Sequence, residues 1–403
     1  MKKKPMNAEH PTFEPDFKDG GGKAFPQLKK GSRIGVVGAG AFGGWSALHL
    51  LRNGFDVTLI DAWGAGNARS SSGDETRVTR STYGRNELYF QMNVRSLDIW
   101  REHEKLFSRK IFYKTGVLWL CHGESTPIVD DSIPFSEKYN CPCEYLDLAV
   151  IGKRYPEINT DDLHHGWLDP HGGYLKAREA CAEVLACFIN EGGRYIQRAV
   201  LPGEVVDRRM NHISLDDGTR LVADIFIFAC GSWLPTLFPE ELGNIIKPTR
   251  QEVYYFGVPP EGAAAFDEMP AWIDADGISM YYGIAGNASR GFKLGVDIRG
   301  RSFDPTSDER LPDTLVLDAA RKFLAHRFPR LNDAPLVESR VCPYENSPSG
   351  NFILDFLPDS ENVLVVGGGS GHGFKHGPAL GELVAKALAG QSDVPLLFSL
   401  SSQ

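Results

Sequence analysis

Long hydrophobic runs are missing from this chain of 403 residues. A membrane-spanning helix needs roughly 18 or more consecutive apolar residues, and no such run occurs in the sequence. The first 32 residues also lack the apolar segment of a secretory signal and instead carry Lys2 to Lys4, several prolines and Gly20 to Gly22. We therefore expect a flexible arm over residues 1–32, no membrane partner and a cytoplasmic protein.

The chain also has no excess of positively charged residues. The formal net charge is -9, with 43 Lys and Arg against 52 Asp and Glu, so polyanions would be repelled. This balance argues against a general nucleic-acid or anionic-membrane binder, although local basic sites for small anions stay open. The length allows two or three domains.

Clusters of metal ligands are scarce. The seven cysteines include one close pair, Cys141 and Cys143. No second Cys or His cluster lies at ligand spacing from it, so the sequence predicts no metal site. An odd number of cysteines without a secretory signal indicates reduced thiols in a cytoplasmic setting.

A glycine-rich nucleotide motif is present near the start. Its parts are a strand over 34–37, the glycines Gly38, Gly40 and Gly43, a helix over 44–53, and a strand over 57–60 that ends at Asp61. The glycines permit a tight turn, close approach of a pyrophosphate and close helix packing, respectively. The helix dipole favours phosphate at that end. Because the Asp61 carboxylate can accept hydrogen bonds from ribose hydroxyls, the motif predicts a dinucleotide site.

A second glycine-rich strand end lies near the C-terminus. A strand over 363–366 leads into Gly367 to Gly369, and a helix over 378–388 follows a loop. In flavoproteins such a segment closes over the flavin ring. A chain that starts and finishes with the same Rossmann-like sheet is unusual for NAD dehydrogenases, so the sequence favours FAD.

The remaining elements predict an α/β fold (α+β overall), in which a Rossmann-like FAD-binding domain carries a second, mainly antiparallel-sheet substrate domain. The FAD-binding domain is assigned to 33–110, 166–245 and 335–395, and the substrate domain to 111–165 and 246–334. Further expected elements are helices over 87–106, 176–190 and 315–327, a hairpin turn at 216–218, and strands over 223–230, 253–256, 279–282 and 292–296.

Several local stretches resemble a known family, the D-amino-acid-oxidase-type flavoenzymes, in the branch that holds monomeric sarcosine oxidase, N-methyltryptophan oxidase, pipecolate oxidases and fructosyl-amino-acid oxidases. The resemblance spans about residues 33 to 395 and keeps the family's order. The stretches are the Gly38 motif, Gly73 to Arg80, Lys114 to Leu118, Tyr281 to Gly283, Phe292 to Gly295, Cys342 to Tyr344, and Ser370 to Lys375.

The resemblance implies an FAD attached through a cysteine thioether to its 8-methyl carbon, and the matching position is Cys342. A buried strand cysteine is the alternative. For His372, a loop histidine satisfied by backbone is the alternative. The cofactor-binding residues implied are Gly38, Gly40, Gly43, Asp61, Cys342, Gly369, Gly371, His372, Gly373 and Phe374.

The resemblance also implies a reaction. A carboxylate-bearing secondary, N-methyl or cyclic amino acid is oxidised by hydride transfer to flavin N5, and O2 then takes the electrons and gives H2O2. Arg80 and Lys375 match the family's carboxylate-binding pair, for which an arginine fork is well suited. The alternative for either residue is a solvated surface charge.

Lys293 lies in an apolar strand, where a lysine is costly unless it has a role. The resemblance implies that it lies near flavin N5 through water and helps O2 accept electrons, because a fixed positive charge stabilises developing superoxide. A structural ion pair is the alternative. Thr76 and Arg77 match residues that hydrogen-bond and polarise the flavin.

Tyr282 and Tyr344 match aromatic positions that line the substrate site, although ordinary sheet aromatics would look the same. Asp297 stands where the family's sarcosine oxidases have a histidine. A carboxylate there repels a substrate carboxylate and attracts a cationic amine or ring nitrogen. This departure favours larger or cyclic amines over sarcosine.

Two other functions stay open. A flavin-dependent amine dehydrogenase would pass electrons to a carrier protein or quinone, but Lys293 favours the oxidase. A non-catalytic flavoprotein would have no need of Arg80, Lys293 and Lys375 together. We expect a monomer that takes a small amino-acid-like substrate and O2.

Overall fold

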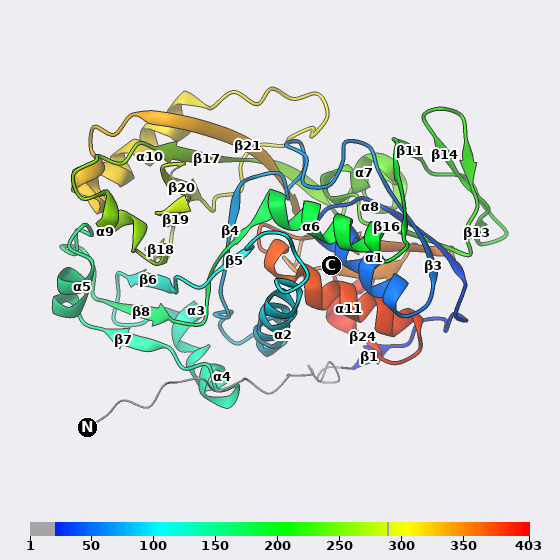
Figure 1. Cartoon of the computed structure of the whole chain (residues 1–403), viewed down its shortest axis with the longest axis horizontal. Helices are drawn as coiled ribbons and strands as arrows, with labels where there is room; N and C mark the ends of the chain where they lie inside the picture. Colours follow the sequence, from blue (N-terminus) through cyan, green and yellow to red (C-terminus); the bar gives the residue numbers. More distant parts are fainter. Residues whose placement is uncertain (1–20, 288–289) are drawn as a thin grey trace.

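The computed structural model describes residues 21–287 and 290–403 and contains a six-stranded and an eight-stranded β-sheet (Figure 1). Smaller sheets of two or three strands accompany them. No helix in the described ranges is long and apolar enough to cross a membrane. The fold is thus the mixed α/β architecture that the sequence predicts.

The six-stranded sheet contains the glycine motif and has the order β10-β3-β2-β16-β23-β22. The first five strands are parallel, and β22 runs antiparallel to β23. This arrangement confirms the predicted βαβ opening and the return of the chain's last strands to the first sheet. The strands are β2 (Arg33–Val37), β3 (Asp56–Asp61), β10 (Arg194–Gln197), β16 (Ile225–Phe228), β22 (Ile353–Phe356) and β23 (Val363–Gly367).

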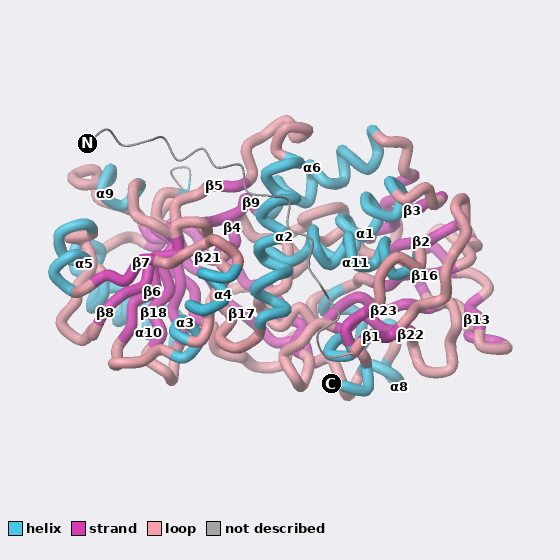
Figure 2. Tube along the Cα trace, turned by 90° about the horizontal axis from the view of Figure 1, so that it is seen from below, coloured by secondary structure: helices cyan, strands magenta, loops and turns pink. Residues whose placement is uncertain are grey.

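Four helices pack together beside this sheet (Figure 2). They are α1 (Ala41–Arg52), α2 (Glu87–His103), α6 (Ala177–Asn190) and α11 (Gly377–Leu388). Helix α1 lies against α6 and α11, where Trp45, Leu48 and Leu380 are fully buried. The expected start of α1 at residue 44 is wrong, because Gly40 is its N-cap and the helix begins one residue later.

The opposite face is covered by short elements whose apolar side chains pack on Phe226 and Phe228. The predicted hairpin turn at 216–218 is confirmed between β14 and β15. The short elements are β11 (Val200–Leu201), β12 (Val205–Val206), β13 (Arg209–Met210), β14 (Ile213–Leu215), β15 (Arg220–Leu221), α7 (Leu234–Leu237) and α8 (Pro239–Leu242).

The eight-stranded sheet has the order β21-β17-β20-β19-β18-β6-β8-β7 and is antiparallel except where β18 meets β6. Helix α10 (Thr314–Arg327) covers one face, where Leu324 packs with Tyr254 and Phe292. The strands are β6 (Val117–Cys121), β7 (Glu144–Leu146), β8 (His165–Asp169), β17 (Lys247–Phe256), β18 (Ala271–Ala275), β19 (Met280–Ile284), β20 (Phe292–Val296) and β21 (Leu336–Asn346).

Strands β17 and β21 pair along their lengths and reach from the eight-stranded sheet toward the six-stranded sheet (Figure 1). The expected domain boundaries at 166 and 335 therefore do not follow the sheets, because β8 and β21 both belong to the eight-stranded sheet. A third sheet is formed by β4 (Thr76–Thr79), β5 (Phe112–Tyr113) and β9 (Gly173–Lys176). The other helices are α3 (Pro127–Asp130), α4 (Ile133–Lys138), α5 (Leu148–Arg154) and α9 (Ala263–Asp267).

The expected flexible arm over 1–32 is wrong for residues 21–32, while residues 1–20 lie outside the described part of the chain. Strand β1 (Gly22–Lys23) pairs with β24 (Val394–Pro395). The Phe25 ring is buried and lies edge-on to Phe356, with ring centroids 5.0 Å apart. Phe25 and Leu28, whose side chain packs on the core and whose N–H donates to the Leu388 carbonyl oxygen at 2.8 Å, thus attach this segment to the rest of the protein.

Candidate functional site

Glycines shape the turn between β2 and α1. A Cβ at Gly38 would lie 2.3 Å from the carbonyl oxygen of Ala229, and one at Gly43 would lie 1.8 Å from that of Gly38. The protein's own backbone therefore requires both glycines. At Gly40 the nearest atom would be Ser72 Oγ at 3.4 Å, so the protein itself leaves room there. This room lies at the N-terminus of α1, where amide N–H groups and the helix dipole attract phosphate.

Asp61 ends β3 beside this turn. Its carboxylate accepts hydrogen bonds from the backbone N–H groups of Ala39 at 2.8 Å, Trp63 at 2.9 Å and Gly64 at 2.8 Å. Burial raises the pKa of Asp61, and these hydrogen bonds oppose the rise. Because a carboxylate has about four acceptor positions, Asp61 keeps the capacity to accept from a ribose hydroxyl.

A cavity of about 290 Å³ runs along the ends of β2, β3, β16 and β23. It brings together predicted residues from both ends of the chain, namely Gly38, Gly40, Asp61, Arg77, Tyr344, Gly369, Gly371, His372, Gly373, Phe374 and Lys375. The other predicted residues do not line it: Gly43 faces the backbone of Gly38, and Thr76, Arg80, Tyr282, Lys293, Asp297 and Cys342 lie outside its wall.

The C-terminal glycine loop closes one end of the cavity. A Cβ at Gly371 would lie 2.5 Å from the Tyr344 ring, and one at Gly373 would lie 2.7 Å from the Phe42 ring, so both glycines permit close packing. His372 Nε2 lies 3.0 Å from the Gly350 carbonyl oxygen, which is the backbone contact named above as the alternative. Burial lowers the pKa of His372 to about 3, so its ring is neutral.

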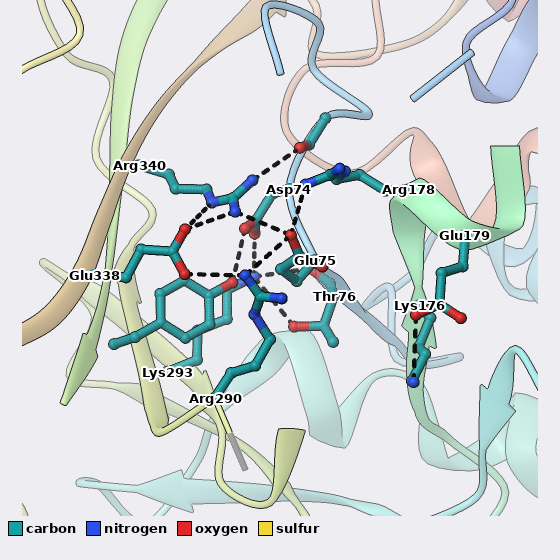
Figure 3. Close-up of polar contacts among 12 residues, drawn as sticks. Asp74, Glu75, Thr76, Lys176, Arg178, Glu179, Arg290, Lys293, Glu338 and Arg340 are labelled. Carbon is teal, nitrogen blue, oxygen red and sulfur yellow. Dashed lines mark hydrogen bonds and ion pairs between the residues drawn. The ribbon is translucent and has the colours of Figure 1, made fainter. Parts of the chain in front are cut away.

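Lys293 projects from β20 into a buried polar cluster (Figure 3). Its ammonium contacts the Asp74 carboxylate and donates to the Thr76 carbonyl oxygen at 2.7 Å. Asp74 also accepts from Arg77 Nη1 at 2.7 Å and from the Tyr255 hydroxyl at 2.7 Å. The ion pair considered as the alternative for Lys293 is therefore present, and the same contacts connect Lys293 to Arg77 in the cavity wall.

The cluster keeps a surplus of positive charge. Burial lowers the pKa of Lys293, and the neighbouring Asp74 opposes that change. Burial alone would raise the pKa of Asp74, but Lys293 and Arg77 outweigh it and hold that pKa below its usual range. One carboxylate thus faces two cations. The adjacent Glu75 contacts three arginines instead, Arg178 at 2.9 Å, Arg290 at 3.5 Å and Arg340 at 3.0 Å (Figure 3).

Arg80 and Lys375 are buried, and no carboxylate in the described ranges forms an ion pair with either of them. The charges of Asp169 and Asp297 act on Arg80, and that of Asp297 acts on Lys375. Arg80 donates to the Thr82 carbonyl oxygen and lies over the rings of Tyr83 and Trp119, while Lys375 Nζ donates to the His372 carbonyl oxygen at 3.0 Å. Burial lowers the pKa of Arg80. Burial and the charge of Arg80 hold the pKa of Lys375 well below its usual value. Arg80 is therefore close enough to act on Lys375, and an anion beside the two side chains would favour the charged form of Lys375.

The Tyr282 and Tyr344 side chains lie close to each other, and each influences the pKa of the other. Asp297 lies near them, and its charge also acts on Arg80 and Lys375. It is held by Arg299, whose Nη1 lies 2.6 Å from Asp297 Oδ1. The structure thus brings these predicted substrate residues close to one another, with Tyr344 and Lys375 in the cavity wall.

The free thiol of Cys342 is buried on β21, two residues before Tyr344. Burial raises the pKa of this thiol, whereas Arg77, Lys293 and Arg310 oppose the rise. Three functional residues were missed by the sequence reasoning: Asp74, Arg299 and Glu345. Asp74 lies inside the motif that carried the resemblance and Glu345 directly follows Tyr344, but only tertiary contacts reveal their roles.

The cavity fits an FAD molecule. The open position at Gly40 and the N-terminus of α1 suit a diphosphate, and Asp61 suits a ribose. Tyr344 and the glycine loop offer an aromatic and a backbone surface at the other end. Among the described residues, no group of three or more His, Cys, Asp or Glu is placed to hold a metal ion.

Comparison with known proteins agrees with this site. Residues 33–387 match the FAD dependent oxidoreductase (DAO) family. The chain is 27% identical to monomeric sarcosine oxidase of Bacillus sp. (strain B-0618), covering 91% of this chain and 95% of that protein. It is 25% identical to N-methyl-L-tryptophan oxidase of Salmonella dublin, covering 89% and 94%.

Solved structures show the same fold. L-proline dehydrogenase from P. horikoshii superposes with a TM-score of 0.79 at 19% identity, over 93% of this chain and 98% of that chain. Fructosyl peptide oxidase from E. terrenum gives 0.77 at 20% identity, over 93% of each chain. The chain therefore belongs to the DAO family of FAD-dependent oxidoreductases and is an enzyme that acts on the carbon–nitrogen bond of amines.

Proposed function

We propose that this protein oxidises a carboxylate-bearing amino acid, with O2 as electron acceptor and H2O2 as product. The observation that carries the proposal is the pair Arg80 and Lys375, two buried cations beside the cavity that contact carbonyl oxygens and aromatic rings. Buried charges are costly without a counter-ion. A substrate carboxylate between them would remove that cost.

The overall reaction balances without further reactants. The amine loses two electrons and two protons and becomes an imine, which water hydrolyses, and O2 gains both electrons and both protons to form H2O2. FAD, when bound, supplies the two-electron acceptor between these halves. The protein's task is to hold the carboxylate at Arg80 and Lys375 and to place the amine beside Tyr282 and Tyr344.

Lys293 and Arg77 support the oxidase reading. Together with Asp74 they leave one surplus positive charge in a buried place, where electrostatic effects are stronger than in water. A fixed positive charge stabilises the negative charge that develops on O2. We assign this role to Lys293, held in place by Asp74 and Thr76.

We also propose that FAD is attached through Cys342. The thiol lies on the same strand as Tyr344. Burial and Asp74 raise its pKa, and the neighbouring Arg77, Lys293 and Arg310 partly offset that rise, which favours the thiolate that a thioether bond requires. Flavin colour that stays with acid-precipitated protein is the expected result. Loss of that colour in Cys342→Ser, with FAD still bound before precipitation, completes the test.

Asp297 points to substrates other than sarcosine. Its carboxylate is fixed by Arg299 on the side of Tyr282 and Tyr344, so it would attract a second cationic or N–H group of the substrate. We propose secondary or cyclic amino acids larger than sarcosine. Anaerobic loss of flavin absorbance, measured across secondary and cyclic amino acids, identifies the preferred amine. No loss with any amine would favour a non-catalytic flavoprotein.

Removing the Arg80 guanidinium tests the carboxylate site. We expect Arg80→Ala to raise the KM for a carboxylated amine by about 100-fold, since a charge-assisted bidentate contact is lost. The KM for the same amine without its carboxylate should stay unchanged. Arg85→Ala is the matched control, because the Arg85 side chain is 88% exposed and pairs with Asp131. Equal effects on both amines would remove Arg80 from the substrate site.

Peroxide yield separates oxidase from dehydrogenase. We expect one H2O2 for each amine oxidised in air, whereas a reaction seen only with an electron-accepting dye would identify a dehydrogenase. We further propose a monomer in the cytoplasm, supported by the similarity to a monomeric sarcosine oxidase and by the seven free cysteines. Gel filtration checks the monomer.

A further inference from the structure

Glu345 directly follows Tyr344, and its carboxyl group is enclosed by two strand ends. Only 7% of the residue is exposed. A Cβ at Gly369 would lie 3.0 Å from Oε1, while Cβ atoms at Gly231 and Gly367 would lie 3.6 and 3.5 Å from Oε2. Three glycines from two separate segments thus leave a niche that the carboxyl group fills.

The carboxyl group of Glu345 is poorly satisfied. Its Oε2 is enclosed and has no hydrogen-bond partner in the described part of the chain, while the backbone N–H groups of Gly368 and Gly369 lie close enough to oppose the effect of burial on its pKa. A buried polar atom without a partner is costly. Because burial raises the pKa of Glu345 to about 7, the neutral carboxylic acid, which has a proton to donate, is well populated at neutral pH.

The position of Glu345 along the cavity indicates which part of FAD it meets. Gly38 packs against Ala229, two residues before Gly231, so the phosphate turn lies beside one wall of the niche. We place the flavin ring on the side of Tyr344, which lines the cavity, because the proposed attachment point Cys342 lies two residues before it on β21. Between the diphosphate and the flavin ring, FAD has only its ribityl chain, which carries hydroxyl groups.

We propose that Glu345 binds FAD as a neutral carboxylic acid whose carboxyl group, in the cavity wall, donates a hydrogen bond to an oxygen of the ribityl chain. The inference rests on the FAD site described above, but not on which amine is oxidised. The ionised carboxylate has no proton to donate and would repel the diphosphate. FAD should therefore be held less firmly as the pH rises through about 7.

Other titratable groups face the same cavity and require a control. Burial raises the pKa of Cys230 and of Asp61 and lowers that of Lys375, and Arg77 stays charged. The Glu345→Gln variant isolates Glu345 from these groups, since the amide keeps a donor of the same shape and does not titrate.

The experiment measures FAD release from loaded protein that carries Cys342→Ser, in which no thioether forms. Dilution starts the release, and the rise in flavin fluorescence gives its rate at about pH 6 and about pH 8.5. With Glu345 present, we expect release to be about tenfold faster at the higher pH, the effect of losing one hydrogen bond. With Glu345→Gln, the two rates should differ by less than about twofold, and Glu345→Ala should release FAD rapidly at both pH values.

Each alternative outcome contradicts the assignment. The same pH dependence in the Glu and Gln proteins, or slower release at high pH, would overturn it, as would Glu345→Ala protein that retains FAD as firmly as its parent. If the Glu345→Ala variant does not fold, the release rates of the Glu345→Gln protein and its parent are enough to decide the test. The proposed function is tested by a different result. It fails if protein with the expected FAD release rates contains a flavin that no amine reduces.

Discussion

The Asp74 carboxylate is the counter-ion of Lys293, although 219 residues separate them in the sequence. Both side chains are only 1% exposed, and removing one member of a buried pair leaves the other uncompensated. Asp74 also contacts Arg77, so it sets the charge of two groups at the flavin end of the cavity. We regard it as a positioning residue that keeps Lys293 protonated.

Asp74→Asn should therefore change the reaction with O2 more than the reaction with amine. Without the carboxylate, burial and Arg77 lower the pKa of Lys293 further, so the ammonium loses its proton at a lower pH. We expect the O2 reaction rate to fall by roughly tenfold or more as the pH rises through that value. Stopped-flow rates of the two half-reactions over a pH series provide the measurement.

Glu75→Gln is the matched control for this prediction. Glu75 is the next residue, but its carboxylate contacts Arg178, Arg290 and Arg340 and not Lys293. This variant should keep the parent's pH profile for the O2 reaction. If both variants lose the O2 reaction equally at every pH, the effect is structural and Asp74 has no specific influence on Lys293.

For single residues, the sequence indicates which positions have a role better than it indicates which other residues they contact. Gly43 was interpretable because its constraint, the carbonyl oxygen of Gly38, belongs to the same turn, and Gly38 because the turn requires a positive φ, here 105°, at that position. The partner of Lys293, the missing partner of Arg80 and the niche of Glu345 depend on contacts between distant segments. No spacing within one segment specifies them.

At the scale of elements, buried ion pairs connect α10 to the eight-stranded sheet. Arg327 at the end of α10 donates to Asp274 of β18 at 2.6 Å and lies 2.9 Å from Asp162. His122, next to β6, lies 2.7 Å from the other oxygen of Asp274. The hydrogen bond to Asp274 raises the pKa of His122, partly opposed by burial and by Arg327.

This raised pKa predicts a pH-dependent stability. A histidine whose pKa is higher in the folded state stabilises the fold fully below its unfolded value, and that contribution is lost as the pH rises through the folded value. We expect the parent's Tm to fall between about pH 6.5 and about pH 8.5 by about 1 to 2 °C more than that of His122→Gln. Differential scanning calorimetry checks this difference.

His212→Gln provides the comparison, because His212 lies between β13 and β14, away from this network. It should follow the parent's pH profile. A His122→Gln protein whose Tm changes with pH as the parent's does would show that the ion pair with Asp274 adds nothing to stability.

Elements with local signals were predicted well. Apolar periodicity and flanking glycines identified β2, β3, β23, α6 and α11 within a few residues. The pairing of β17 with β21, and therefore the true extent of the eight-stranded sheet, was not predictable because strand partners are chosen by long-range packing. The segment at 21–32 was misjudged for the same reason, since β24 lies at the other end of the chain.

At the scale of the whole molecule, the cofactor cavity joins segments that are otherwise far apart. Its wall takes residues from the β2–α1 turn, from 198–237, from β21 and from the C-terminal loop. A ligand that binds only the folded chain stabilises it by about 2.7 kcal/mol when its concentration is 100 times Kd. FAD, when bound, should therefore stabilise the contacts between the first and last segments of the chain.

Added flavin should raise the Tm of the Cys342→Ser protein. We expect the increase to grow with free FAD, by several degrees at about 100 times Kd. FMN should give a smaller increase, because it lacks the adenosine whose ribose would reach Asp61. Thermal unfolding over a concentration series of each flavin provides the test. Equal increases with FAD and FMN would place no adenosine at Asp61.

One long strand fixes the geometry of three chemically different groups. Cys342 and Tyr344 lie on one face of β21 and Glu345 on the other, and the ladder with β17 is regular from Asn346 to Glu338. Inserting one residue within this ladder would turn the thiol and the phenol to the wrong side together. The number of residues between Cys342 and Glu345 is therefore as important for the site as their chemical identity.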